Sequence, residues 1–155
     1  MSVNLVCLEK ESLPPDIFLK QLTAVLEDLL AENRLGDGEV NLIITGDDEL
    51  SRLNSQYRSK EGSTDVLSFT YLEPDRVEIE QGEDFAVGDI YISLDRALIQ
   101  AGEAGVKPEM EVALLAIHGL LHLLGYEHDN DTDLALMRRK EQEVLSCLES
   151  RVKGD

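Results

Sequence analysis

The chain carries the stretch VALLAIHGLLHLLGYEHD at residues 112–129, and both the fold and the site can be worked out from it. It contains all three histidines of the protein, His118, His122 and His128. His118 and His122 are four residues apart, so on a helix their rings project from the same face. Gly125 favours the left-handed conformation that ends a helix, after which the chain can bring His128 back towards the other two. The spacing therefore predicts three converging imidazoles.

Three neutral imidazoles with an open fourth position are typical of a catalytic zinc site, because structural zinc sites close all four positions. Zinc lowers the pKa of its bound water to about 7 and so provides hydroxide at neutral pH. The alternative is a set of ordinary histidines that bond to carbonyl groups. Residues 112–124 are apolar nearly all round, however, which predicts a buried helix whose histidines need polar partners. We therefore expect one Zn²⁺ on His118, His122 and His128, with Ni²⁺ or another divalent metal also compatible.

The same histidine spacing occurs in the metzincin proteases, which makes a zinc peptidase or another metal hydrolase the alternative. Those proteases place a glutamate general base directly after the first histidine. This chain has Gly119 in that position. Glu127 follows the predicted end of the helix, and nothing in the sequence places it at a metal-bound water. The metal ligands of a metzincin are thus present without its base.

Outward from the histidine helix, hydrophobic periodicity predicts alternating strands and helices. We expect strands at 3–8, 40–45, 66–71 and 87–93, and helices at 16–34, 47–57, 94–104, 108–124 and 131–149. Residues 40–45 are apolar on both faces, which favours a central strand. Residues 72–86 are acidic and favour a loop with at most a short strand at 77–79. The order indicates an α+β (α/β-like) fold with a mixed sheet of about four strands and the metal-binding helix in the C-terminal half.

The length of 155 residues predicts a single domain over 1–155. A net charge of −18 argues against a general nucleic-acid coat protein, although it leaves room for a local basic cleft. Arg52, Arg58 and Lys60 form a small basic island of that kind. Cys7 and Cys147 suggest no disulfide framework, which fits a reducing compartment. The N-terminus resembles no secretory signal and residues 112–124 are too short to span a bilayer, so we expect a cytoplasmic protein with no membrane partner.

Three further segments become informative when they are taken together with the histidine motif. They are Asn54-x-x-Tyr57-Arg58, the sequence TDVLSF at 64–69 and the sequence GDIYIS at 88–93. In order and spacing, they and the motif H-G-x-L-H-L-x-G-Y-x-H resemble the YbeY family of bacterial endoribonucleases, also called rRNA maturation factors, over about half of the chain. Glu127 stands where that family usually has Asp, which keeps the charge and changes no proposed ligand.

The resemblance implies a metal-dependent, single-strand-specific endoribonuclease that matures the 3′ end of small-subunit rRNA and acts in ribosome quality control. It implies a zincin-like domain and zinc on the three histidines, and it makes Arg58 important for activity. The guanidinium of Arg58 could bind a phosphate, although an ordinary pair with Glu61 is the alternative. Asp65 is either a turn cap or a group that orients a histidine ring. The implied partners are rRNA, the small ribosomal subunit and ribosome-assembly proteins rather than DNA. A non-catalytic ribosome-assembly factor with a structural metal is the remaining alternative.

Overall fold

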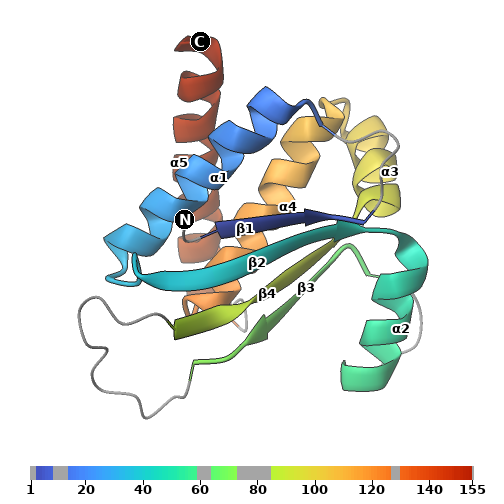
Figure 1. Ribbon diagram of the computed structural model, residues 1–155. Helices are drawn as coiled ribbons and strands as arrows, with labels where there is room; N and C mark the ends of the chain where they lie inside the picture. The colour runs from blue at the N-terminus through green and yellow to red at the C-terminus, as the bar shows by residue number, and fades with distance from the viewer. Residues whose placement is uncertain (1–2, 9–13, 59–63, 73–84, 127–129, 155) are drawn as a thin grey trace.

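The computed structural model describes residues 3–8, 14–58, 64–72, 85–126 and 130–154, and all structural statements concern these residues (Figure 1). The predicted order of elements is confirmed. The elements are β1 (Val3–Cys7), α1 (Asp16–Glu32), β2 (Gly38–Thr45), α2 (Asp47–Arg58), β3 (Val66–Thr70), β4 (Phe85–Ser93), α3 (Leu94–Ala104), α4 (Pro108–Leu123) and α5 (Asp131–Gly154).

The four strands form one mixed sheet in the order β1-β2-β4-β3. The β1–β2 and β2–β4 pairs are parallel, whereas β3 runs antiparallel to β4. The prediction of a central strand at 40–45 is confirmed, because β2 lies between β1 and β4 and buries Leu42, Ile43 and Ile44. The mixed sheet with helices confirms the α+β fold.

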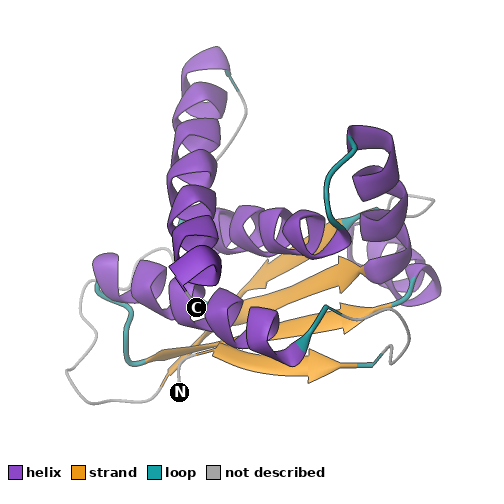
Figure 2. Cartoon of the chain, turned by 90° about the horizontal axis from the view of Figure 1, so that it is seen from above, coloured by secondary structure: helices purple, strands orange, loops and turns teal. Residues whose placement is uncertain are grey.

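The two faces of the sheet are covered differently. Helices α1 and α4 lie against one face with α5 packed across them, and α2 lies against the other face (Figures 1 and 2). Because side chains alternate along a strand, neighbouring residues of β4 meet different helices. Ile90 lies under α4, next to Gly119, whereas Tyr91 packs with Leu50 and Leu53 of α2. Helices α4 and α2 are therefore on opposite faces.

Most element boundaries agree with the prediction to within two residues, and the start of β4 and the end of α5 are the two differences that tertiary contacts explain. Strand β4 begins at Phe85, inside the segment expected to be a loop, because Phe85 and Ala86 pair with the first residues of β2. The suggested short strand at 77–79 lies outside the described residues. Helix α5 continues to Gly154, past the expected end at 149. Beyond that end, the guanidinium of Arg151 pairs with the carboxylate of Asp28 on α1, so tertiary contact accompanies the extra turn.

Other predictions concern the cysteines and the membrane. Cys7 and Cys147 are both unpaired, as expected from their number and separation. Among the helices in the described part of the chain, none has the length and apolarity needed to cross a bilayer.

Candidate metal centre

Two of the three predicted ligands lie together on α4. The Nε2 atoms of His118 and His122 are 3.1 Å apart, and their ring centroids are 4.6 Å apart. The i, i+4 spacing therefore places both rings on one face of the helix, with their Nε2 atoms directed at the same point. The third predicted ligand, His128, lies outside the described residues, so its approach to this point stays a prediction.

The surroundings of the two rings combine a buried helix with a local opening. Helix α4 buries most of its residues, as the apolar sequence predicted. His118 and His122 are only half-buried, and the side chain of His118 is 29% exposed. The rings thus occupy the side of the helix that is closest to solvent, which leaves an ion or a substrate a way to reach them.

Glu141 on α5 holds the other nitrogen of His118. Its Oε1 atom lies 2.6 Å from Nδ1 of His118, and the Glu141 side chain is only 13% exposed. An ionised carboxylate can only accept a hydrogen bond, so a neutral His118 carries its proton on Nδ1. Its Nε2 atom then presents a lone pair towards His122. A carboxylate behind a metal-binding histidine is the usual arrangement at protein metal sites, because it fixes the tautomer and the orientation of the ring.

Glu141 was not among the residues predicted for the site, although the sequence contained a signal for it. Met137, Val144 and Leu148 form the buried stripe of α5. Glu141 falls on the same stripe, since it is one helical turn from Met137 and one from Val144. A carboxylate on the buried side of a helix needs a partner. His118 is that partner.

The donor atoms of His118 and His122 fit a divalent metal. Two imidazole nitrogens face one point, and a carboxylate fixes the proton of one ring on the far side. Within the described ranges, no group of three or more potential ligands gathers, so the described chain offers two ligands rather than a complete site. A three-histidine site therefore needs His128.

The structure explains why a glycine follows the first histidine. A Cβ atom at Gly119 would lie 2.7 Å from Cγ2 of Ile90 and 3.0 Å from Oγ of Ser68. The Ser68 hydroxyl donates a hydrogen bond to the carbonyl of Gly119 at 3.0 Å. Position 119 therefore faces the sheet at close range. The position that carries the general base in a metzincin has no room for a side chain in this packing.

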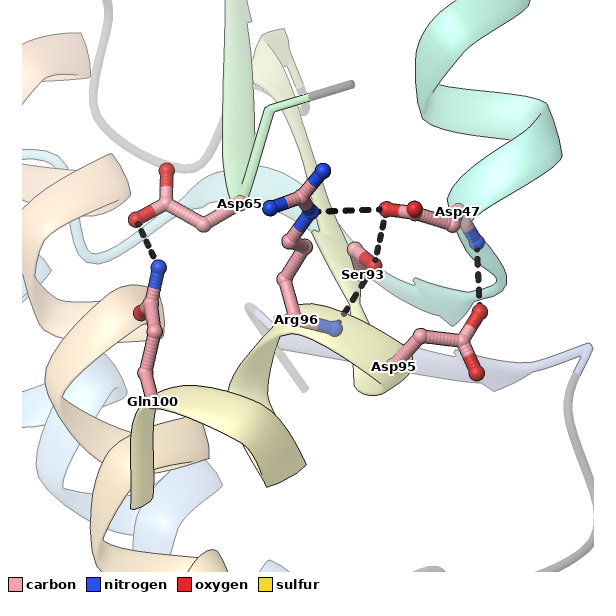
Figure 3. Close-up of polar contacts among 6 residues, drawn as sticks. All are labelled: Asp47, Asp65, Ser93, Asp95, Arg96 and Gln100. Atoms are coloured by element: carbon pink, nitrogen blue, oxygen red, sulfur yellow. Dashed lines mark hydrogen bonds and ion pairs between the residues drawn. The ribbon is translucent and has the colours of Figure 1, made fainter. Parts of the chain in front are cut away.

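Two other residues of the shared segments, Asp65 and Ser93, are shown with their polar partners in Figure 3. Asp65 was expected to cap a turn or to orient a histidine ring. Its carboxylate accepts a hydrogen bond from Gln100 at 3.2 Å. The carboxylate that contacts His118 belongs to Glu141 instead. Ser93 caps α3, because its hydroxyl oxygen accepts a hydrogen bond from the Arg96 amide. Part of the 88–93 segment is thus explained by helix capping.

The basic island differs in part from the prediction. Arg52 is paired within α2, since its guanidinium donates to both carboxylate oxygens of Glu49 and to Gln56. Arg58 is the last residue of α2, and its side chain is outside what the structure describes. Lys60 also lies outside the described residues. Helix α2 places the backbone of Arg58 on the side of the sheet away from α4.

Comparison with known proteins gives a consistent result. A family model described as "Endoribonuclease YbeY" matches residues 7–149. A protein of that name from Pelotomaculum thermopropionicum is 44% identical over 125 residues, which cover 81% of this chain and 82% of the relative. One from Desulforamulus reducens is 39% identical over 149 residues, which cover 96% and 97%. The solution structure of a Thermotoga maritima protein aligns with a TM-score of 0.66 at 27% identity, covering 98% of this chain and 92% of that one. The chain therefore belongs to the YbeY endoribonuclease family.

Proposed function

We propose that this protein is a metal-dependent endoribonuclease that cleaves single-stranded RNA, with the 3′ end of small-subunit rRNA as its substrate and ribosome quality control as its wider role. Membership of the YbeY family supports the reaction class. The observation that carries the metal dependence is the pair of imidazoles on α4, one of which is held from behind by Glu141.

His118, His122 and His128 would hold the metal. A bound divalent ion such as Zn²⁺ supplies Lewis acidity for a water molecule and positive charge for a phosphoryl oxygen. The chain's own part is to fix the ligands. Glu141 keeps the His118 proton on Nδ1, and close packing at Gly119 fixes α4 against the sheet. The half-buried setting of the rings limits the water around them, which strengthens electrostatic interactions there.

Arg58 would add positive charge to the bound RNA. A guanidinium binds phosphate through two parallel hydrogen bonds, which suits a substrate that develops negative charge during cleavage. Because α2 lies on the face away from α4, Arg58 would bind an RNA strand that extends past the edge of the sheet. An Arg58→Ala variant that binds and cleaves RNA as well as the unchanged protein would rule this role out.

The charge of −18 shapes how the enzyme would find its substrate. Long-range attraction between the protein and the RNA backbone is weak, so we expect modest affinity for free RNA and delivery by the small ribosomal subunit or by assembly proteins. Comparable affinity for isolated RNA and for small subunits would contradict this expectation.

A zinc peptidase or another metal hydrolase is less well supported, because position 119 provides no base on the metal-binding helix. An assembly factor with a purely structural metal is the other alternative. A metal-dependent endoribonuclease and such an assembly factor differ in the effect of losing a metal ligand. Replacing His128 abolishes cleavage but leaves the fold intact if the metal is catalytic, whereas it unfolds the protein if the metal is structural.

The test pairs metal analysis with an RNA cleavage assay. The protein is purified without a histidine tag, its metal content is measured, and it is incubated with single-stranded RNA and with small ribosomal subunits. About one metal per chain is expected, with cleavage lost after chelation and in His118→Ala. Stoichiometric metal without cleavage of either substrate would favour the assembly factor. Cleavage that survives His118→Ala would indicate a contaminating nuclease and would remove the direct support for the proposal.

A further inference from the structure

A second candidate site lies on the face of the sheet away from α4. A groove of about 320 Å³ is lined there by residues of α2, β4 and the β3 segment. They are Arg52, Leu53, Tyr57, Phe69, Tyr71, Asp89 and Tyr91. The chain has four tyrosines, three phenylalanines and no tryptophan. Three of the four tyrosines and one phenylalanine therefore gather in a single groove, although the low aromatic content and the lack of tryptophan argue against a broad base-stacking surface.

The aromatic rings form an ordered but open group. Phe69 lies at its centre, with ring centroids 5.6 Å from Tyr57 and 5.8 Å from Tyr91, and both pairs meet edge to face. Such pairs stabilise one another, so the rings are held in place before any ligand binds. Tyr57 is nevertheless 61% exposed and Tyr71 54% exposed. Two rings at the rim of the groove are thus available for stacking.

A row of polar side chains fixes a carboxylate within the groove. Asp89 Oδ1 accepts a hydrogen bond from Asn41 at 2.9 Å, and Asp89 Oδ2 accepts one from the hydroxyl of Tyr71. Asn41 in turn accepts a hydrogen bond from Asn4 at 3.3 Å, so the row extends to β1. The bond to Asp89 raises the pKa of Tyr71 to about 12, which keeps its hydroxyl a donor at neutral pH. Each Asp89 oxygen can still accept one further hydrogen bond, from a donor group of a ligand.

We propose that this groove binds bases of single-stranded RNA, which stack on Tyr57 and Tyr71 and donate an exocyclic amino group to Asp89. The proposal rests on the endoribonuclease function proposed above. A chain of charge −18 repels the phosphate backbone at long range, so its affinity for RNA has to come largely from the bases. Stacking of bases on aromatic side chains provides such affinity, and it does so for every base. The carboxylate adds selectivity, because it accepts from the exocyclic amino group of cytosine, whereas uracil has a carbonyl oxygen at the same ring position, which a carboxylate repels.

The position of β3 relates this groove to the metal centre. Strand β3 ends the sheet, with β4 as its only partner strand among the described residues. Ser68 of β3 contacts the Gly119 carbonyl, next to His118, whereas the following residue, Phe69, lines the groove. An RNA strand that crosses the edge of the sheet at β3 would therefore meet both sites. The groove would hold nucleotides that flank the scissile bond rather than the reacting nucleotide.

The test measures binding of short oligocytidylate and oligouridylate to the metal-loaded protein, with RNA integrity checked on gels. Because the chain has no tryptophan and three of its four tyrosines line the groove, intrinsic tyrosine fluorescence reports directly on the site. We expect oligocytidylate to quench this fluorescence and to bind about tenfold more tightly than oligouridylate, as one lost hydrogen bond to a charged group predicts.

Groove variants and a matched control complete the design. Tyr57→Ala and Tyr71→Ala should each lower the affinity for both oligomers about tenfold, the usual effect of removing one stacking side chain. Asp89→Asn should abolish the preference for cytosine. Ile99→Ala removes an apolar side chain that is as exposed as Tyr71 but lies on α3, outside the groove, and it should change nothing. Circular dichroism and thermal unfolding identify any variant that has lost its fold, in which case Tyr71→Leu and Tyr57→Leu, which also remove the aromatic ring, replace it.

The outcomes separate this proposal from the endoribonuclease function. Equal affinity for the two oligomers, no quenching by either, or unchanged binding by the folded tyrosine variants would overturn the groove proposal. If the unchanged protein cleaves RNA in these cases, the proposed function stands without the groove. Binding with the expected selectivity but no cleavage of any RNA would instead leave the groove and refute the endoribonuclease.

Discussion

Replacing Glu141 with glutamine measures how far α5 contributes to metal binding on α4. The change keeps the shape of the side chain but removes the charge that fixes the proton of His118 on Nδ1. The bond is short, at 2.6 Å, and the Glu141 side chain is only 13% exposed, so solvent screens it little. Loss of a partner behind a metal-binding histidine typically weakens metal affinity about 10- to 100-fold, which corresponds to about 1.4–2.7 kcal/mol. We expect Glu141→Gln near the lower figure and Glu141→Ala near the upper one.

Two measurements check this expectation. Competition with a chromophoric chelator gives the metal dissociation constant of each variant. Nitrogen-15 NMR of the metal-free protein gives the tautomer of His118, which should carry its proton on Nδ1 when Glu141 is present and lose that preference in Glu141→Ala. The second readout does not depend on enzyme activity or on bound metal, so it separates a positioning role from a general loss of structure.

Glu143→Gln is the matched control, because it removes the same charge from the same helix two residues away. Glu143 is 62% exposed and pairs with Lys140, not with a histidine. Its replacement should leave metal affinity within about twofold of the unchanged protein, as expected of a surface pair. Equal losses in Glu141→Gln and Glu143→Gln would show a nonspecific effect of charge. Unchanged affinity and an unchanged His118 tautomer in a folded Glu141→Ala variant would refute the reasoning.

Three further predictions concern packing and ionisation. Gly119→Ala should destabilise the protein by about 1–3 kcal/mol in urea unfolding, because the sheet occupies the space of the added methyl group, and an increase in stability would contradict the close approach. The phenol of Tyr71 should titrate near pH 12 in ultraviolet absorbance, and Asp89→Asn should bring this value down. Since the folded-state pKa of Tyr71 lies above the ordinary value of 10.0, its bond to Asp89 stabilises the protein fully below pH 10 and less as pH rises through about 12. Cys147 should react with a thiol reagent faster than Cys7, because Cys147 is exposed whereas burial raises the pKa of Cys7, and equal rates would contradict this.

The order of the elements could be predicted because it depends on local patterns. Alternating or continuous apolar runs marked the strands, and Pro15 and Gly105 lie where helices begin and end. The start of β4 and the end of α5, which the prediction missed, both depend on tertiary contact. Phe85 belongs to β4 only because β2 provides backbone partners for it. In the last turn of α5, the guanidinium of Arg151 forms an ion pair with the carboxylate of Asp28 on α1. Neither partner is near in sequence, so no local pattern could indicate them.

The same distinction applies to the candidate metal centre. The pairing of His118 and His122 follows from helical geometry alone, and the sequence predicted it. The contact between His118 and Glu141 joins residues 23 positions apart and depends on how α5 crosses α4. The stripe on α5 could show that Glu141 faces inward, but only the packing of the two helices identifies its partner. Arg52 is a similar case, since the sequence showed its charge but did not reveal its bonds to Glu49.

The alternation of side chains along β3 and β4 gives the shared sequence segments a physical meaning. Ser68 and Ile90 face α4 and set its distance from the sheet, whereas Phe69 and Asp89 face the groove. The segments at 64–69 and 88–93 thus contribute to both faces with alternate residues of one antiparallel pair. A register shift of one residue would exchange the two sets and disrupt both faces at once. We therefore expect the whole of each segment to be needed, even if only one face of the sheet takes part in cleavage. The reason is that the same strand pairing positions α4 and orders the groove.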